Sequence, residues 1–178
     1  MVFISSSKVS FLTPLKLVSI TFLAIIISAC GFHLKGQLPI PQALKTIKLA
    51  SLSAMPSFDQ TLKKSLKLAD VILLDESALV DNEVLELKVL KITYTDKTLS
   101  TASNNDITET ERLMKASYFI RDSTGKSLYG PRTVSISRVL SNQNASDDTV
   151  LAYNKEQMAD MAEDLAQQLV SDLAYAPL

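Results

Sequence analysis

Residues 154–173 read NKEQMADMAEDLAQQLVSDL, and this stretch has the clearest helical pattern in the chain. Its apolar side chains recur at helical spacing, which predicts an amphipathic helix with one face in a core. They are Met158, Met161, Leu165, Leu169 and Leu173. Asn154 is a residue type that caps helices, and Gln157 stands at the capping-box position. The sequence therefore predicts a helix that begins after Asn154 and ends before Pro177.

The segment before the middle of the chain predicts a strand, a helix and a second strand. Thr46–Ala50 alternates apolar and polar residues, as a half-buried strand does. A helix follows Pro56, and its apolar stripe consists of Phe58, Leu62, Leu66 and Ala69. The compact apolar run Val71–Leu74 then predicts a buried strand.

The middle of the chain predicts further strands. Val84–Thr95 alternates, but the phase of its pattern changes in mid-run, which predicts a β-bulge or a bend. Arg112–Arg121 and Thr133–Leu140 predict two more strands, and the stretches Leu99–Asp106 and Ser141–Asp148 predict polar loops. The order of elements predicts an α+β fold, with two helices packed on one face of a mixed, mostly antiparallel four- to five-stranded sheet.

Residues 27–31, Ile-Ser-Ala-Cys-Gly, have the form of a bacterial lipoprotein cleavage site. Two lysines precede a thirteen-residue apolar run that ends at Ala29, and no acidic residue lies upstream. The run is too short to span a bilayer. We expect a lipoprotein signal peptide over residues 1–29, cleavage between Ala29 and Cys30, and acylation of the Cys30 thiolate. The alternative is an ordinary signal peptide, or a buried N-terminal helix, with an incidental cysteine.

Cleavage would leave residues 30–178 as a single periplasmic domain of 149 residues, with 30–44 as an extended tether. The full chain carries 18 basic and 19 acidic residues; loss of Lys8 and Lys16 leaves 16 basic residues and a net charge of −3. Such a chain lacks the basic surplus of a nucleic-acid-binding protein. Because Cys30 is the only cysteine, no disulfide within the chain is expected.

The sequence offers few groups for catalysis. His33 is the only histidine and lies in the predicted tether, so neither a histidine-containing catalytic triad nor a His/Cys metal cluster is expected. No glycine-rich phosphate loop is present. The carboxylates Asp106, Glu109 and Glu111 leave one enzymatic alternative, a hydrolase with paired carboxyl groups, although a solvated strand edge is the simpler interpretation. We therefore expect no enzyme, no cofactor and no metal.

Residues 30–36, Cys-Gly-Phe-His-Leu-Lys-Gly, resemble the mature start of the LPS-assembly lipoprotein family LptE, which opens Cys-Gly-aromatic-x-Leu-basic. The order of parts extends the resemblance: a proline, a short strand, a helix with Leu62 and Leu66, and the apolar strand at Val71–Leu74. Near the end, Leu151-Ala152 and the helix with Ala/Leu spacing also look like the family's C-terminal helix. The resemblance covers essentially the whole mature chain.

The resemblance implies a lipoprotein of the Gram-negative outer membrane that faces the periplasm and is held by N-terminal acyl chains such as palmitate. Its implied partner is an LptD-type β-barrel, which it plugs and helps to assemble for the insertion of lipopolysaccharide. Gly31 after Cys30, in place of Asp, fits sorting to the outer membrane. The family's lipopolysaccharide contacts are basic residues near loop tips, and the candidates here are Lys97, Arg112 and Lys155.

A different class of function stays open, a stand-alone lipid-binding or chaperone-like lipoprotein that acts at the periplasmic face without a barrel. Basic residues on the strands would then form its site, because Lys and Arg hold phosphate by charge and by hydrogen bonds. Co-purification with a much larger barrel distinguishes the two functions.

Overall fold

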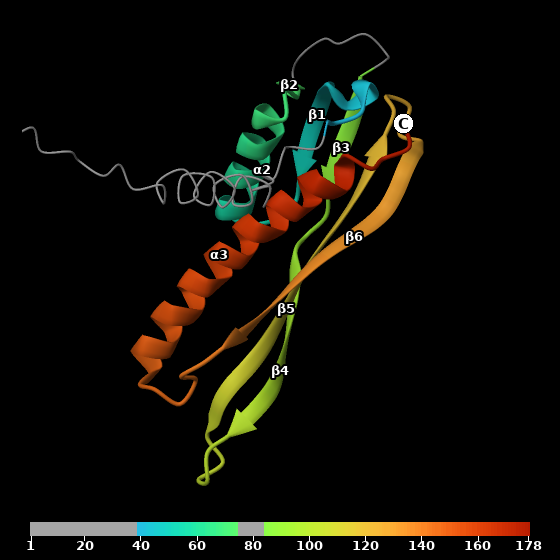
Figure 1. Ribbon diagram of the computed structural model, residues 1–178. Helices are drawn as coiled ribbons and strands as arrows, with labels where there is room; N and C mark the ends of the chain where they lie inside the picture. Colours follow the sequence, from blue (N-terminus) through green and yellow to red (C-terminus); the bar gives the residue numbers. More distant parts are fainter. Residues whose placement is uncertain (1–38, 75–83) are drawn as a thin grey trace, which may run out of the picture. The chain divides into compact units, whose positions relative to one another are not determined.

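The computed structural model describes residues 39–74 and 84–178 (Figure 1). The predicted signal peptide, the Cys30 lipidation site and His33 lie outside the described residues. In chain order the elements are a 3-10 turn η1 (Gln42–Leu44), β1 (Thr46–Ser51), α2 (Pro56–Leu68), β2 (Ile72–Leu74), β3 (Leu85–Val89), β4 (Thr93–Thr101), β5 (Ile107–Arg121), β6 (Ser127–Leu140) and α3 (Asp147–Leu173).

Six strands of the described part form one mixed sheet, and β5 is its central element. β5 pairs antiparallel with β6 along most of its length. Its other edge pairs antiparallel with β3 through residues 118–121 and with β4 through residues 107–115. β1 lies beyond β3 and is parallel to both β3 and β2. The predicted mixed, mostly antiparallel sheet is confirmed, with six strands in place of four or five.

The sixth strand comes from the predicted change of phase within residues 84–95. The chain stops pairing as β3 at Val89 and resumes as β4 at Thr93, with Ile92 buried between them. At the break, the backbone N–H of Leu90 still donates to the carbonyl oxygen of Ser117, at 2.8 Å. The bend therefore moves the chain from one half of β5 to the other along the same edge.

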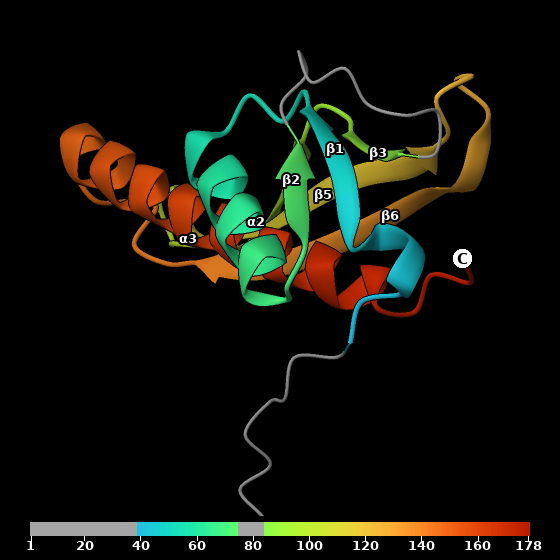
Figure 2. The ribbon, with the colours of Figure 1, turned by 90° about the horizontal axis from the view of Figure 1, so that it is seen from above.

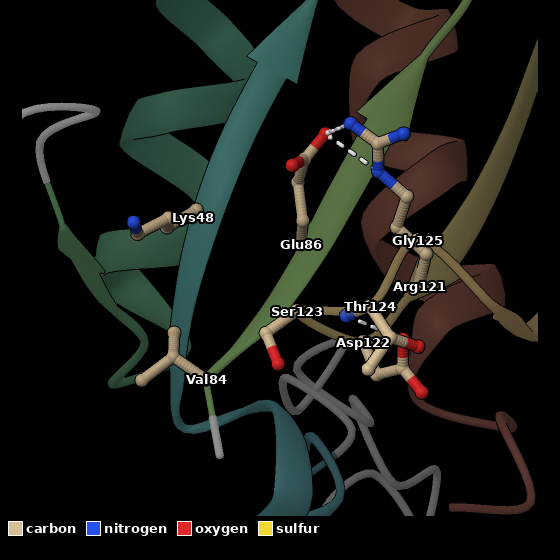
Figure 3. Close-up of a pocket in the computed structure, with 8 residues that line it drawn as sticks. All are labelled: Lys48, Val84, Glu86, Arg121, Asp122, Ser123, Thr124 and Gly125. Carbon is tan, nitrogen blue, oxygen red and sulfur yellow. Dashed lines mark hydrogen bonds and ion pairs between the residues drawn. The ribbon is translucent and has the colours of Figure 1, made fainter. Parts of the chain in front are cut away.

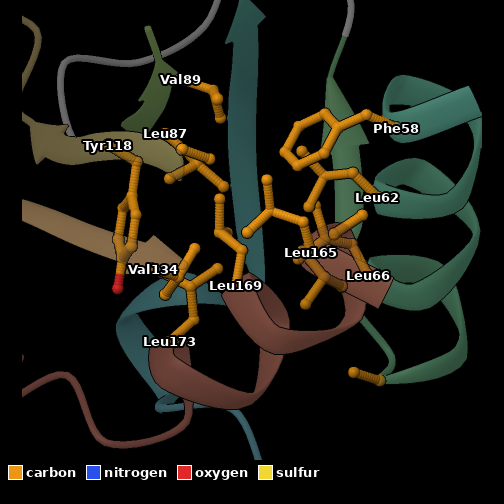
Figure 4. Packing of buried hydrophobic residues seen from close by; sticks show 14 of the residues in the cluster. Phe58, Leu62, Leu66, Leu87, Val89, Tyr118, Val134, Leu165, Leu169 and Leu173 are labelled. Carbon is orange, nitrogen blue, oxygen red and sulfur yellow. The ribbon is translucent and has the colours of Figure 1, made fainter. Parts of the chain in front are cut away.

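α2 and α3 pack on the same face of this sheet (Figure 2). From Thr110 to Ile120, alternate residues of β5 point toward the helices and are buried, while the residues between them are not. The core lies between the sheet and the layer formed by the two helices (Figure 4). Its buried residues are Leu87, Val89, Met114, Ala116, Tyr118 and Ile120 from the sheet, Phe58, Leu62 and Leu66 from α2, and Met161, Leu165, Leu169 and Leu173 from α3. The predicted α+β fold with two helices on one face is confirmed.

β2 is an edge strand, although its apolar sequence predicts a buried one. It pairs with β1 alone, and Ile72 is 62% exposed. Val71, just before the strand, is buried, and Leu73 packs against the core. The apolar run predicts a strand correctly, but its place in the sheet depends on which strands pair.

α3 begins two turns earlier than the sequence predicts. Ser146 precedes the first turn, which contains Asp147 and Asp148, two charges that favour the positive end of the helix dipole. Asn154 is therefore no cap: its side-chain amide donates to the Gln143 side chain at 3.0 Å and accepts a hydrogen bond in return. No residue of 147–160 is buried, so the first turns lack the apolar periodicity that marks the rest of the helix.

The predicted tether, residues 30–44, is wrong at its C-terminal end. Ile40 and Leu44 are almost fully buried and belong to the core cluster. η1 brings Leu44 inward, and its backbone N–H donates to the carbonyl oxygen of Pro41 at 2.9 Å. Residues 39–44 are thus part of the folded domain.

Both predicted loops are shorter than expected. β4 runs through Thr101 and β5 begins at Ile107, so the hairpin turn comprises residues 102–106. The second loop comprises residues 141–146, because Asp147 and Asp148 belong to α3. The backbone N–H of Gln143 donates to the carbonyl oxygen of Thr108 at 3.1 Å, which holds the second loop beside the hairpin. We call these two segments, 102–106 and 141–146, the loop end.

Candidate functional site

The three predicted lipopolysaccharide contacts do not form one cluster. Lys97 of β4 lies opposite Glu111 of β5, and its neighbour Asp96 lies opposite Arg112. Successive side chains of a strand project from opposite faces. Arg112 is 9% exposed and lies on the face that the helices cover, so Lys97 projects from the other face. Lys155 is exposed on α3, apart from both.

Arg112 is bound inside the domain by Asp96. Its Nε donates to Asp96 Oδ1 at 2.7 Å and its Nη2 donates to Asp96 Oδ2 at 2.6 Å, a bidentate pair. The guanidinium carbon lies 4.9 Å from the centre of the Tyr94 ring. The hydrogen bonds from Arg112 lower the pKa of the Asp96 carboxyl, and those same bonds raise the pKa of Arg112. The Arg112 guanidinium is therefore engaged within the domain and is not presented to a ligand.

A second arginine extends this pair into a layer of charges between the sheet and α3. Arg138 of β6 lies directly opposite Arg112 on β5. Its Nη2 donates to Asp164 Oδ2 at 2.7 Å and its Nη1 lies 3.4 Å from Asp160 Oδ2. Like charges directly opposite in a sheet repel, and the carboxylates of β4 and α3 offset this repulsion. We call Asp96, Arg112, Arg138, Asp160 and Asp164 the arginine layer.

The sequence gives no local signal for the arginine layer. Asp96 and Arg112 are 16 residues apart, and Arg138 and Asp164 are 26 apart. Only the hairpin register and the docking of α3 bring them together. Arg138 lies within the predicted strand Thr133–Leu140, but its acidic partners lie on the polar face of a helix, where charges are ordinarily solvated.

A further charged cluster holds the C-terminal half of α3 on the sheet. The Tyr118 hydroxyl donates to Asp172 Oδ2 at 2.5 Å, and Arg132 Nη2 donates to Asp172 Oδ1 at 2.9 Å. The Arg132 guanidinium also lies over the Tyr129 ring. The hydrogen bond from Arg132 lowers the pKa of Asp172, whereas burial, with the Asp172 charge, raises the pKa of Tyr118.

We expect Asp172→Asn to reduce the free energy of unfolding near neutral pH by about 1–2 kcal/mol, because an amide still accepts from Tyr118 but loses the charge opposite Arg132. The contribution of Asp172 is present above its unfolded pKa, about 3.9, and is lost as pH falls through its lower folded pKa. Urea unfolding between about pH 2 and pH 7 measures this. Between about pH 7 and pH 2, the free energy of unfolding should fall less for Asp172→Asn than for the wild type. The control Ser171→Ala should fall as the wild type does, and equal losses for all three proteins would contradict the expectation.

Lys155 belongs to a strongly acidic helix. α3 carries seven acidic residues and Lys155 as its one basic residue. Lys97 in turn has Glu111 as its cross-strand neighbour. Lys97, Arg112 and Lys155 do not lie next to one another, so the two exposed lysines could not bind one phosphate group together.

A polar pocket of about 330 Å³ lies on the face of the sheet that the helices leave uncovered (Figure 3). It is lined by Lys48, Val84, Glu86, Arg121 and residues 122–125. Arg121 donates to Glu86 Oε1 at 2.8 Å, and Asp122 accepts hydrogen bonds within its own turn. The carboxylates considered for hydrolysis, Asp106, Glu109 and Glu111, do not line it.

Within residues 39–74 and 84–178, no group of three or more His, Cys, Asp or Glu side chains could hold a metal ion. None of the helices in these ranges has the length and apolar character needed to cross a bilayer. Every buried side-chain nitrogen and oxygen in the same ranges has a hydrogen-bond partner.

Comparison with known proteins gives concordant matches. The family model described as "LptE: Lipopolysaccharide-assembly" matches residues 44–173. The LPS-assembly lipoprotein LptE of Pectobacterium atrosepticum is 29% identical over 155 residues, which is 85% of this chain and 80% of that protein. Among solved structures, a minor lipoprotein from Acinetobacter baumannii has a TM-score of 0.62 at 23% identity, covering 75% of this chain and 93% of that one. The rare lipoprotein B from Shewanella oneidensis has a TM-score of 0.60 at 16% identity, covering 72% and 93%.

Proposed function

Since the chain belongs to the lipopolysaccharide-assembly family LptE, we propose that it is an outer-membrane lipoprotein that plugs and helps to assemble an LptD-type β-barrel. In this role it takes part in the insertion of lipopolysaccharide and performs no enzymatic step. The family match over residues 44–173 is the observation that carries the proposal.

The geometry of the loop end supports the plug role. The hairpin turn 102–106 and the loop 141–146 lie together, and their side chains are mainly polar and exposed. The lumen of a wide β-barrel is polar and would otherwise be an aqueous hole. We propose that the loop end enters the lumen, because its polar surface suits that environment.

The anchor in this proposal is Cys30. A peptidase would cut after Ala29, and the acyl chains on Cys30 would hold the domain at the periplasmic face of the outer membrane. Each buried methylene adds about 0.8 kcal/mol to membrane affinity, so several chains give a stable attachment. Cys30→Ala should yield an unprocessed precursor that no longer fractionates with outer membranes. Normal fractionation of that variant would contradict the anchor.

Gentle detergent extraction of the tagged full chain tests the plug role. We expect a stoichiometric partner much larger than this chain, whose mobility on a gel changes on heating, as folded β-barrels do. Extraction of the protein without such a partner would contradict the proposal and favour the stand-alone lipid-binding lipoprotein.

For lipopolysaccharide contacts we propose Lys97 and Lys155, because Arg112 is engaged by Asp96. Reversal of both lysines to Glu should weaken binding to lipopolysaccharide aggregates severalfold at low salt, and the difference should shrink as salt rises. Lys115→Glu, an exposed reversal on β5, is the matched control. Equal binding by the double variant and the control would remove both lysines from the site.

A further inference from the structure

The end of the domain opposite the loop end exposes four apolar side chains. Leu68 at the end of α2 and Ile72 at the start of β2 are 58% and 62% exposed. Tyr175 and Leu178, which follow α3, are 69% and 37% exposed. With the exposed Lys67, we call these residues the anchor end.

Hydrogen bonds and packing place the members of the anchor end on one side of the domain. The backbone N–H of Ile72 donates to the carbonyl oxygen of Lys45 at 2.8 Å, just before β1. Lys45 Nζ donates to the carbonyl oxygen of Ala69, at the end of α2. α3 ends at Leu173, and the chain that follows it lies on this side of the domain (Figure 2). Figure 2 shows η1, the C-terminus and the end of α2 along the same side of the domain.

The C-terminal residues are held in a defined position. The backbone N–H of Tyr175 donates to the carbonyl oxygen of Asp172, and that of Ala176 donates to the carbonyl oxygen of Leu173, both at 3.1 Å. Because Ala176 is buried, the adjacent Tyr175 ring is presented to solvent by a fixed backbone. Tyrosine prefers membrane interfaces, where its ring and its hydroxyl find different environments.

The length of chain before the described domain limits the distance of this end from a bilayer. Cys30 lies nine residues before Pro39. Nine fully extended residues span about 30 Å. α3, which runs from the loop end to the anchor end, has 27 residues and is about 40 Å long. With Cys30 acylated, the anchor end is the part of the domain held nearest to the lipid.

Charge separates the two ends of the domain. The loop end and the start of α3 carry the exposed carboxylates Asp106, Asp147 and Asp148. The last turns of α2 carry the exposed Lys63, Lys64 and Lys67, with Asp70 as the nearby acid. Leu151 and Ile107 expose apolar surface near the loop end as well. Lys155 lies one helical turn from Leu151, but Asp106, Asp147 and Asp148 leave this end with an acidic balance, which an anionic lipid surface repels.

We propose that the anchor end lies against the lipid headgroups of the membrane that holds the acyl chains. Apolar and aromatic side chains with neighbouring lysines suit this interface. The contact holds the anchor end at the periplasmic surface of the membrane, and the loop end, at the other end of α3, is the part that reaches into the barrel lumen. This inference rests on the proposed acylation of Cys30.

Site-specific labelling of the acylated full chain in vesicles tests the contact. An acylated Cys30 has no free thiol, so an introduced cysteine is the single labelling site. Tyr175→Cys reports on the anchor end, and Leu151→Cys is its matched control, because the two side chains are 69% and 70% exposed at opposite ends of α3. Each takes a fluorophore whose emission shifts to shorter wavelength in an apolar environment. The vesicles contain phosphatidylethanolamine and phosphatidylglycerol.

We expect the label at position 175 to shift to shorter wavelength and to be quenched by brominated lipids, and the label at 151 to do neither. A label at Leu68→Cys should show the same wavelength shift and quenching. This second variant tests the contact even if Tyr175→Cys does not fold. Lys64→Glu with Lys67→Glu should reduce the quenching in anionic vesicles, whereas Lys115→Glu should not.

Two failures are distinguishable in this experiment. Labels at 68 and 175 that respond no more than the label at 151, in a chain whose Cys30 takes no label, would overturn the contact and leave the anchor intact. Labelling of Cys30 in the wild-type chain would instead show that the cysteine is not acylated, which overturns the proposed anchor.

Discussion

Asp96→Ala is expected to reduce the free energy of unfolding by about 3–5 kcal/mol, a large share of the stability of an ordinary domain. The substitution removes both hydrogen-bond acceptors of Arg112, whose side chain is only 10% exposed. The remaining guanidinium would be left unpaired and directly opposite Arg138. Urea unfolding followed by circular dichroism measures the change.

Two further variants separate the loss of the ion pair from other effects. Lys97→Ala changes the adjacent residue on the uncovered face of β4 and should stay within about 0.5 kcal/mol of the wild type. Asp96→Leu combined with Arg112→Met removes both charges and should recover to within about 1 kcal/mol of the wild type, because no charge is left buried. A loss under about 1 kcal/mol for Asp96→Ala would mean that water solvates Arg112 adequately.

Leu165→Ala is expected to reduce the free energy of unfolding by about 2–5 kcal/mol. Leu165 is 0% exposed and lies in the core between α3, α2 and the sheet (Figure 4). Its truncation removes apolar contacts with both layers and leaves a cavity that the sheet cannot close by a local shift.

Leu151→Ala provides the matched control on the same helix. Leu151 is 70% exposed, and alanine has the higher helix propensity, so the variant should stay within about 0.5 kcal/mol of the wild type. The contrast tests the division of α3 into a buried C-terminal half and a first half held by polar contacts. Equal losses from both variants would contradict this division.

The sequence predicts the main elements because burial imposes a period on each of them. The spacing of Met161, Leu165 and Leu169 predicts the buried half of α3, and the alternation of residues 46–50 predicts β1. The change of phase within 84–95 predicts the break that separates β3 from β4. Residues 147–160 bury no face, so their apolar side chains show no helical periodicity. The sequence therefore predicts the start of α3 two turns too late.

The candidate site was less accessible to sequence reasoning. Lys97, Arg112 and Lys155 share a charge type, but no local pattern tells which of them is exposed. The hairpin register turns Arg112 inward and Lys97 outward, since one residue of shift exchanges the two faces of a strand. The acylation site at Cys30 remains a prediction from the sequence and awaits the labelling experiment.

The sequence by itself determined the two amphipathic helices and the strands of the sheet, because each is encoded in the periodicity of neighbouring residues. The lipoprotein-type leader stays a prediction from the order of residues 1–31. Only the tertiary structure decided that Arg112 pairs with Asp96, that Asp172 joins Tyr118 to Arg132, and that the anchor end gathers Leu68, Ile72 and Tyr175. The hydrogen bonds among these residues join positions 16 to 54 residues apart, and no local spacing can specify them. They depend on strand register and helix docking, which the packing of the whole core sets.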